Sequence, residues 1–341
     1  MKRTASLDIA KGFTMILVVL GHCYSFSQNN FILYWIYGFH MPFFFLVSGI
    51  LYGQKADREK GFHLNLCKKI KARLIPYFVF EILFACYLCL AQYLADGLTI
   101  DFAVKKFLAI FNFTGLHTTW FLPCLLLVEI IFSMLMKAGK GPCTAVMIGL
   151  MLVGLLVPKP SGYQVVLLRC FVACGFFAMG FVAHPWWTQK QHPAIVAVAA
   201  VIYGLLAAKN GLVSIVSCTF ENAALYVLNS LLGTFVLLQL SMGLHQTCGQ
   251  MRIISGLAYI GRNSIIVLCT QSFVIEVIRL VDYKLLHSFL PQLGYGEGFV
   301  FCTLVMLIEI PTMIIGRKYY PPLFGMQEKR IKNETENHHL P

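Results

Sequence analysis

The chain has 341 residues, of which 58% are hydrophobic and only 12% are charged. Soluble domains carry roughly 25% charged residues, so this composition excludes a disordered chain, a nucleic-acid-binding domain and an ordinary cytosolic enzyme. The net charge of +12 does not change this, because the basic residues lie between hydrophobic blocks and not along one face. A polytopic helical membrane protein remains, since about 20 apolar residues span a bilayer as a helix. The segments are apolar throughout, without the alternation of a transmembrane barrel.

Ten apolar segments predict about ten transmembrane helices, which form one all-α bundle over residues 1–320. In chain order they cover residues 9–27, 32–53, 74–94, 119–136, 143–157, 163–183, 194–208, 223–243, 263–281 and 298–316. A short polar tail, residues 321–341, follows the last segment. No long soluble domain interrupts the helices, so we expect any chemistry to use the bundle and its interfaces.

The basic residues predict the orientation, because lysine and arginine are enriched in cytoplasmic loops. With the N-terminus inside, 20 of the 27 basic residues fall in cytoplasmic segments, 6 in outer loops, and Arg169 in a span. This split predicts that both termini, and therefore the tail, are cytoplasmic. It also requires an even number of spans.

The first predicted helix carries Asp8, Lys11 and His22. Lys11 and His22 are close to three helical turns apart, so they share one face and are separated by about 16 Å along the axis. Asp8 lies three residues before Lys11, at a spacing that allows an ion pair. Lys11 is then near the cytoplasmic interface, while His22 lies well inside the membrane. There the imidazole is either a satisfied core group or a base that works at neutral pH.

The second predicted helix contains His40 and Pro42, followed by Ser48 and Gly49. Proline removes a backbone donor and bends a helix, and glycine permits close backbone approach. A kink beside His40 and a small Ser48-Gly49 step suit a lined pocket, but they suit close helix packing equally well.

Five further charged residues fall in or near predicted spans, although a charge at the centre of a spanning helix costs about 2.5–3.5 kcal/mol on insertion scales. They are Glu81, Glu129, Arg169, Glu276 and Glu309. Each alone fits a pair between helices or a position at a helix end. Together they predict a polar cavity within the bundle.

Most of the 12 cysteines lie inside apolar segments, where cysteine behaves as a small hydrophobe. Cys86 and Cys89 form a C-x-x-C within one predicted span, but no further metal ligands or redox partners are evident near them. We therefore expect neither a metal site nor a bound cofactor.

Five short motifs stand in order along the chain. They are Lys11 with His22 in a basic-x10-His spacing, Phe39-His40-Met41-Pro42-Phe43-Phe44 with Ser48-Gly49, Lys71-Ala72-Arg73-Leu74-Ile75-Pro76-Tyr77, Trp120-Phe121-Leu122 with Glu129, and Gly261-Arg262-Asn263-Ser264. In this order, from residue 8 to about residue 275, the chain resembles the acyltransferase 3 family of integral membrane acyltransferases, in the stand-alone form that includes sugar O-acetyltransferases.

Two positions depart from the family pattern. Gln271 stands in a late helix where many members have histidine. Ile70 lies three residues before Arg73, where the family often has the first arginine of an R-x-x-R pair, and the nearest cations are Lys69 and Lys71. These departures concern the expected roles around Gln271 and Arg73 and leave His22 unaffected.

The resemblance implies transfer of an acyl group from cytosolic acyl-CoA, usually acetyl-CoA as co-substrate, to a hydroxyl of a cell-surface or lipid-linked glycan, at the bacterial cytoplasmic membrane. His22 would take the proton from the acceptor hydroxyl. Lys11, Lys69, Lys71 and Arg73 would bind the donor, since CoA carries several phosphate charges. The basic cluster equally fits a topology signal and contact with anionic lipid.

Acyl transfer also needs donors aimed at the developing oxyanion. The pocket or oxyanion candidates are Asp8, His40, Ser48, Trp120, Glu129, Arg169, Asn263 and Ser264. The sequence does not rank them, and it leaves both a single- and a double-displacement mechanism open.

Two other functions fit the same composition. Embedded carboxylates with Arg169 are typical of a transporter path, although no inverted repeat is evident between the two halves of the chain. A non-catalytic membrane subunit of a polysaccharide-export system is the other alternative. Each reading has the lipid bilayer as a partner and no nucleic acid.

Overall fold

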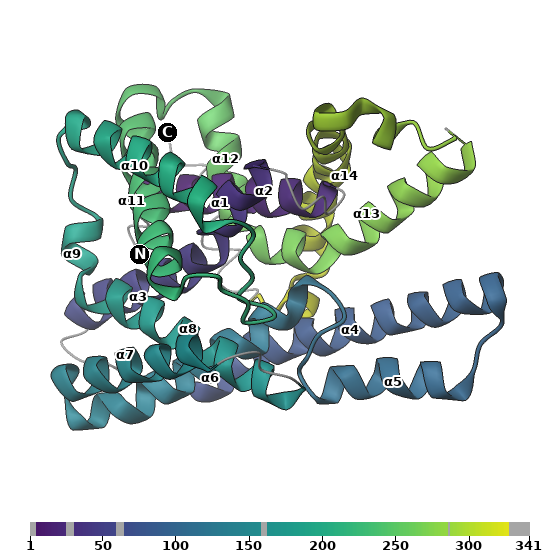
Figure 1. The fold of residues 1–341 in the computed structure, drawn as a ribbon, viewed down its shortest axis with the longest axis horizontal. Coiled ribbons are helices and arrows are strands. Elements are labelled where there is room, and N and C mark those ends of the chain that lie inside the picture. Colours follow the sequence, from purple (N-terminus) through teal and green to yellow (C-terminus); the bar gives the residue numbers. More distant parts are fainter. Residues whose placement is uncertain (1–4, 25–30, 59–64, 158–161, 286, 327–341) are drawn as a thin grey trace.

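The computed structural model describes residues 5–24, 31–58, 65–157, 162–285 and 287–326. In these ranges the only pairing of β type is an isolated bridge between Ser214 and Thr219, and all other regular elements are helices (Figure 1). The predicted fold class, a polytopic all-α bundle, is confirmed. The end of the first predicted span, residues 25–27, and the tail from residue 327 lie outside the described residues.

The described helices follow one another in chain order, with η marking a 3-10 turn. They are α1 (Ala5–Cys23), α2 (Phe31–Tyr37), α3 (His40–Arg58), α4 (Leu66–Asp96), α5 (Ile100–Phe111), η1 (Thr118–Trp120), α6 (Phe121–Leu135), η2 (Met136–Ala138), α7 (Lys140–Leu156), α8 (Tyr163–Val182), α9 (His184–Trp187), α10 (Pro193–Asn210), α11 (Ala223–Cys248), α12 (Arg252–Arg262), α13 (Ser264–Leu285), η3 (Leu290–Gly296), α14 (Glu297–Tyr319) and η4 (Pro321–Phe324).

Nine helical segments of the described chain are long and apolar enough to cross a membrane, and nine of the ten predicted spans coincide with them. The other predicted span, 143–157, corresponds to α7, an apolar helix of 17 residues. At 1.5 Å per residue α7 is about 25 Å long, against a hydrocarbon core of about 30 Å. It packs along α8, where a Cβ at Gly154 would lie 2.7 Å from the carbonyl oxygen of Leu168.

Two details of the first spans differ from prediction. α1 begins four residues before the predicted span and ends at Cys23, so His22 lies in its last turn and not well inside a longer helix. The second predicted span is interrupted between Tyr37 and His40, and Pro42 lies in the first turn of α3. Pro42 has no N–H for the carbonyl of Gly38 four residues earlier, and that carbonyl accepts from Ser230 Oγ instead. The bend expected beside His40 is therefore present, as a break between α2 and α3.

The sequence does not predict α5 and α12, because both helices contain charged residues and are not continuous apolar segments. α5 runs beside α4 (Figure 1), and Tyr77 of α4 donates to the carbonyl oxygen of Ile110 at 2.7 Å. α12 packs on α1 just before α13 begins.

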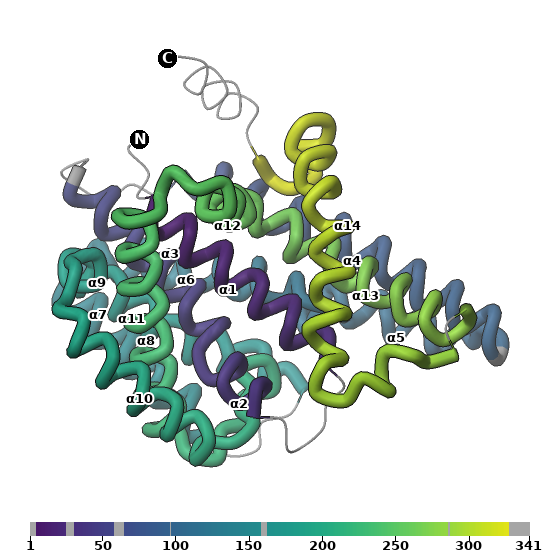
Figure 2. Tube along the Cα trace, turned by 90° about the horizontal axis from the view of Figure 1, so that it is seen from above, coloured from purple at the N-terminus to yellow at the C-terminus, as the bar shows by residue number. Residues whose placement is uncertain are grey.

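Helix α1 lies in the middle of the bundle (Figure 2), where it contacts α2, α3, α11, α12, α13 and α14. The contact with α12 depends on two glycines. A Cβ at Gly12 would overlap the carbonyl oxygen of Leu257, and a Cβ at Gly261 would overlap that of Asp8. The two backbones approach this closely because neither glycine has a side chain.

Several chain segments meet at one end of the bundle, which we call the basal end. Gly261 contacts Asp8 at the start of α1, Arg317 at the end of α14 donates to Asn263, and the turn after η4 packs on Ala72 near the start of α4. The starts of α1, α4 and α13 and the end of α14 therefore share this end. The charge distribution predicts that it faces the cytoplasm.

Candidate active site

The Asp8–Lys11 pair of α1 forms as the sequence predicts. Lys11 Nζ is 2.7 Å from Oδ1 of the buried Asp8 at the basal end. His22 lies in the last turn of α1, about 16 Å further along the axis. There Arg279 of α13 donates from Nη2 to the carbonyl oxygen of His22 at 3.2 Å. Arg279 thereby caps the C-terminal end of α1, where the helix dipole favours a cation.

Two further imidazoles lie near His22. His40 and His117 are both close enough to it for the ring charges to interact. His40 is buried, with Nδ1 2.9 Å from the carbonyl oxygen of Ile36. A carbonyl only accepts, so this nitrogen carries a proton. Tyr37 packs edge-on against His40 at 4.9 Å. His22, His40 and His117 come from three separate segments and gather at the end of α1, and we call them the histidine cluster.

His117 occupies the loop between α5 and η1, and a carboxylate holds this loop in place. The His117 side chain is only 2% exposed, and its Nε2 lies 3.8 Å from Oε1 of Glu81. The fully buried Glu81 also accepts from Leu116 N at 2.8 Å and from Thr119 Oγ1 at 2.5 Å. The embedded Glu81 therefore fixes the residues on both sides of His117.

The protonation state of His117 follows from its neighbours. Burial lowers the pKa of His117 to about 4, so the ring is uncharged at neutral pH. The Thr118 hydroxyl donates its one proton to the carbonyl oxygen of Leu268 at 2.7 Å and lies 3.5 Å from His117 Nδ1.

Asp8, Lys11 and His22 lie along one side of α1, and we call them the α1 stripe. A second line of polar side chains, the α4 stripe, runs along α4 from the basal end. Lys69 and Arg73 both bind Oε1 of the buried Glu129 in α6, at 2.7 and 3.2 Å. Tyr77 and Glu81 follow at the same four-residue spacing, which keeps all four on one side of the helix. Glu81 is about 18 Å along α4 from Lys69. The α4 stripe thus links a cationic group to the His117 loop, as the α1 stripe links Lys11 to His22.

The predicted donor-binding cations of α4 do not all lie together. Lys69 and Arg73 are partly buried around Glu129, whereas the Lys71 side chain is exposed. One carboxylate faces two cations in this cluster, so the Lys69, Arg73 and Glu129 side chains together keep a net positive charge.

Asn263 and Ser264 lie at the basal end and not beside His22. The Asn263 side chain donates from Nδ2 to the carbonyl oxygen of Tyr259 at 2.9 Å, and its Oδ1 accepts from Arg317 at 3.0 Å. Ser264 begins α13, about 22 Å along that helix from Arg279, which binds His22. The structure therefore separates these two oxyanion candidates from the histidines.

Trp120 and Arg169 hold the same loop from its other side. The Arg169 guanidinium is buried and lies 4.9 Å from the centre of the Trp120 ring. It donates to the carbonyl oxygens of Phe113 and Thr114. Arg169 and Glu81 thus fix the two ends of the segment that carries His117.

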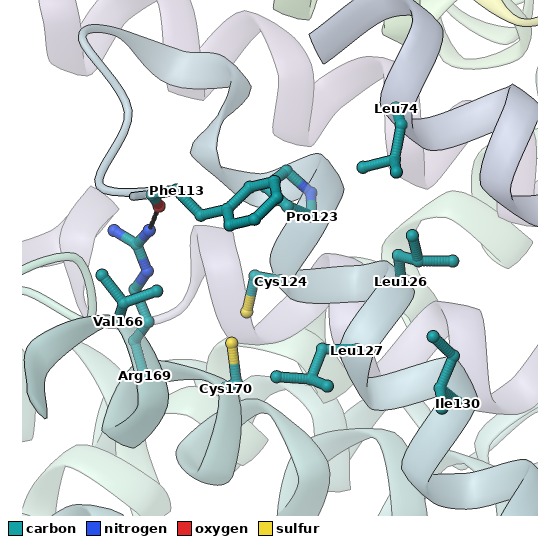
Figure 3. Close-up of a pocket in the computed structure, with 10 residues that line it drawn as sticks. All are labelled: Leu74, Phe113, Pro123, Cys124, Leu126, Leu127, Ile130, Val166, Arg169 and Cys170. Carbon is teal, nitrogen blue, oxygen red and sulfur yellow. Dashed lines mark hydrogen bonds between the residues drawn. The ribbon is translucent and has the colours of Figure 1, made fainter. Parts of the chain in front are cut away.

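An apolar cavity of about 220 Å³ opens beside Arg169 (Figure 3). Leu74 of α4, Phe113 and residues of α6 and α8 line it, among them Cys124 and Cys170, whose thiols point toward one another. None of the three histidines lines this cavity. It is therefore separate from the histidine cluster.

Ser48 and Gly49 favour the packing alternative. Ser48 donates to the carbonyl oxygen of Phe44 at 2.8 Å. A Cβ at Gly49 would overlap the carbonyl oxygen of Phe177 and lie 2.8 Å from Phe181 N. This step brings α3 against α8.

The remaining embedded glutamates have different surroundings. Glu276 lies in the middle of α13, where its side chain is 37% exposed and pairs with Arg279 of the same helix at 3.3 Å. Glu309 is fully buried, and its two carboxyl oxygens lie 3.0 and 2.8 Å from Thr270 Oγ1, within hydrogen-bond distance. The embedded charges thus occupy several separate clusters.

Three residues of these clusters were missing from the sequence-based set. His117 stands in a polar stretch without periodicity, and only the embedded Glu81 signals that a partner is needed. Arg279 and Arg317 follow long apolar segments and read as topology signals. Their contacts with His22 and Asn263 require knowledge of which helices are neighbours.

A family model described as an acyltransferase domain matches residues 4–310 of the chain. The chain belongs to the acyltransferase 3 family. The resemblance seen in the motifs is confirmed, and this acyltransferase is a multi-pass integral membrane protein. No curated protein and no solved structure matches it. The matched region contains each of the site residues above except Arg317.

Proposed function

We propose that this acyltransferase moves an acetyl group from cytosolic acetyl-CoA to a hydroxyl of a cell-surface or lipid-linked glycan. The supporting observation is the α1 stripe, which begins at the Asp8–Lys11 pair and ends at His22 among two other histidines. The choice of acetyl and of a glycan, and the location in a bacterial cytoplasmic membrane, rest on the resemblance to sugar O-acetyltransferases.

The basal end fits the phosphate groups of CoA. Lys11, Lys69 and Arg73 approach it from α1 and α4, and phosphates bind where such cations gather. Each stripe leads about 16–18 Å from these cations to the histidine cluster. An extended pantetheine arm is of that order, so the donor phosphates would stay at the basal end while the thioester reaches His22.

At the other end, His22 would act as the general base. The acceptor oxygen attacks the thioester carbonyl carbon while its proton passes to His22. The carbon–sulfur bond then breaks, and His22 returns the proton to the departing thiolate. The products are an ester and CoA with a free thiol, and no further reactant is needed. His40 and His117 would form the walls of the same pocket.

The test compares His22→Ala with His245→Ala, which changes an exposed histidine near the end of α11. Free thiol is measured as purified protein consumes acetyl-CoA, and mass spectrometry measures acetyl groups on surface glycans of cells that carry each variant. A general base contributes about 10²–10⁴-fold, so His22→Ala should lose activity by that factor while His245→Ala keeps it. A folded His22→Ala variant with near wild-type turnover would refute the proposal.

The same preparation tests the transporter alternative. If the protein is a transporter, vesicles that contain the purified protein will take up a glycan precursor in the absence of acyl-CoA and release no thiol. That result would replace the transferase proposal.

A further inference from the structure

Gln271 of α13 is fully buried, yet neither its Oε1 nor its Nε2 has a hydrogen-bond partner among the described residues. The amide of Gln239, another buried glutamine, has partners for both of its polar atoms. Gln239 of α11 donates from Nε2 to the carbonyl oxygen of Gln189 at 3.0 Å, and its Oε1 accepts from Gln191 N at 2.9 Å. The two residues provide a matched pair, one amide satisfied and one not.

Gln271 lies on the side of α13 that meets the histidine cluster. Leu268, Gln271, Ile275 and Arg279 follow one another at spacings of three and four residues, which places them on one helix face. The Leu268 carbonyl accepts from Thr118 beside His117, and Arg279 binds the carbonyl of His22. Residues before and after Gln271 on this face therefore contact the segments that carry His117 and His22.

The position of Gln271 along the bundle axis also agrees with a place near the His22 ring. α1 and α13 both run from the basal end toward the contact between Arg279 and His22. Side chains of a helix lean toward its N-terminus. Arg279 therefore reaches back along α13 to His22, and the His22 ring leans back along α1. This brings the imidazole toward the level of Gln271.

A buried amide without partners costs about 1–3 kcal/mol, and in a native protein it needs an explanation. Packing would be served better by leucine, which has nearly the same volume and no polar atoms. Two donors and one acceptor, on the side of α13 that meets the histidine segments, are what a polar ligand would satisfy.

We propose that Gln271 donates a hydrogen bond from Nε2 to the carbonyl oxygen of the acyl group and stabilises the oxyanion when the acceptor attacks. This inference rests on the proposed function. Negative charge grows on that oxygen as the new carbon–oxygen bond forms and disappears when the carbon–sulfur bond breaks, while the proton moves by way of His22. Gln271 forms no covalent bond and transfers no proton.

The geometry favours Gln271 over the candidates taken from the sequence. Asn263 already uses both amide atoms at the basal end. Trp120 stacks with Arg169, and His40 uses Nδ1 on Ile36. Gln271 differs from these because both of its donors are unused by the described chain.

The test measures stability and kinetics of Gln271→Leu, with Gln239→Leu as the matched control. We expect Gln271→Leu to unfold at the wild-type temperature or above, because leucine removes an unpaired buried amide. Its kcat should fall about 10²–10³-fold, as for the loss of one oxyanion donor, while KM for acetyl-CoA changes less than about threefold. Gln239→Leu should unfold at a lower temperature, since it leaves the Gln189 and Gln191 groups unpaired, and should keep kcat near wild type.

Three results would overturn the inference. One is a Gln271→Leu variant with kcat within about threefold of wild type. Another is a drop in its unfolding temperature like that of Gln239→Leu, which would show a structural role. In both cases the proposed function would still stand, because the wild-type protein would still transfer the acyl group. A wild-type protein that consumes no acyl-CoA would refute the proposed function together with this inference.

Discussion

Substitution of Gly12 by alanine tests how α1 is seated in the bundle. A Cβ at this position would overlap the carbonyl oxygen of Leu257, lie 2.9 Å from its carbonyl carbon and lie 3.3 Å from Gly261 N. All three are backbone atoms, so no side-chain rotation relieves the contact. Moving the carbon to an ordinary 3.4 Å contact requires half an ångström of separation between α1 and α12, and the oxygen requires more.

Overpacking of this kind costs about 1–3 kcal/mol, and we expect Gly12→Ala near the upper value because both partners are helix backbone. Gly256→Ala is the control on α12, where nothing lies within 4 Å of the added Cβ. Alanine there should stabilise the protein by about 0.4–1 kcal/mol, because it restricts the unfolded chain. Thermal unfolding of the purified proteins in detergent, followed by tryptophan fluorescence, measures both.

The two substitutions should therefore shift the unfolding temperature in opposite directions. A Gly12→Ala protein as stable as wild type would refute the close contact between α1 and α12. Equal shifts in both variants would show that the added methyl group acts through helix propensity alone.

Three other predictions concern the charged groups. Glu129→Ala leaves two partly buried cations without their carboxylate and should cost about 3–5 kcal/mol of stability, whereas Asp101→Ala, which breaks an exposed pair, should leave the unfolding temperature unchanged. Lys11→Ala should raise KM for acetyl-CoA, and unchanged kinetics would remove Lys11 from the donor site. His117 stays uncharged when folded, so its contribution to stability is present above its ordinary pKa of 6.5 and is lost as the pH falls toward about 4. Stability of His117→Asn should therefore fall less between these pH values than wild type, and parallel curves would contradict the buried, neutral ring.

Hydrophobicity alone predicted nearly all the long helices, because a bilayer requires long apolar segments whatever their neighbours are. It could not reveal α5 or α12, which are amphipathic and carry charges such as Asp101 and Arg252. It also joined α2 to α3, since the break before His40 leaves the apolar run intact.

The polar site was predictable only where the partners share one helix. The Asp8–Lys11 pair follows from helical spacing, and the structure contains it. Pairing of Lys69 with Glu129 and of Glu81 with His117 depends on how α4 packs against α6 and against the loop after α5. Spacing within a segment carries no information on such contacts. For this reason Gln271 appeared in the sequence only as a departure from a pattern.

The contact between α1 and α12 also has a consequence for biogenesis. The Gly12 face of α1 is covered by Leu257 and Gly261, which are synthesised 245 and 249 residues later. Until α12 has been synthesised, the Gly12 face of α1 is in contact with lipid or with the insertion machinery instead of with α12. Nascent chains that stop before α12 would expose the glycine face permanently, and membrane proteases would meet a bundle whose central helix was never enclosed.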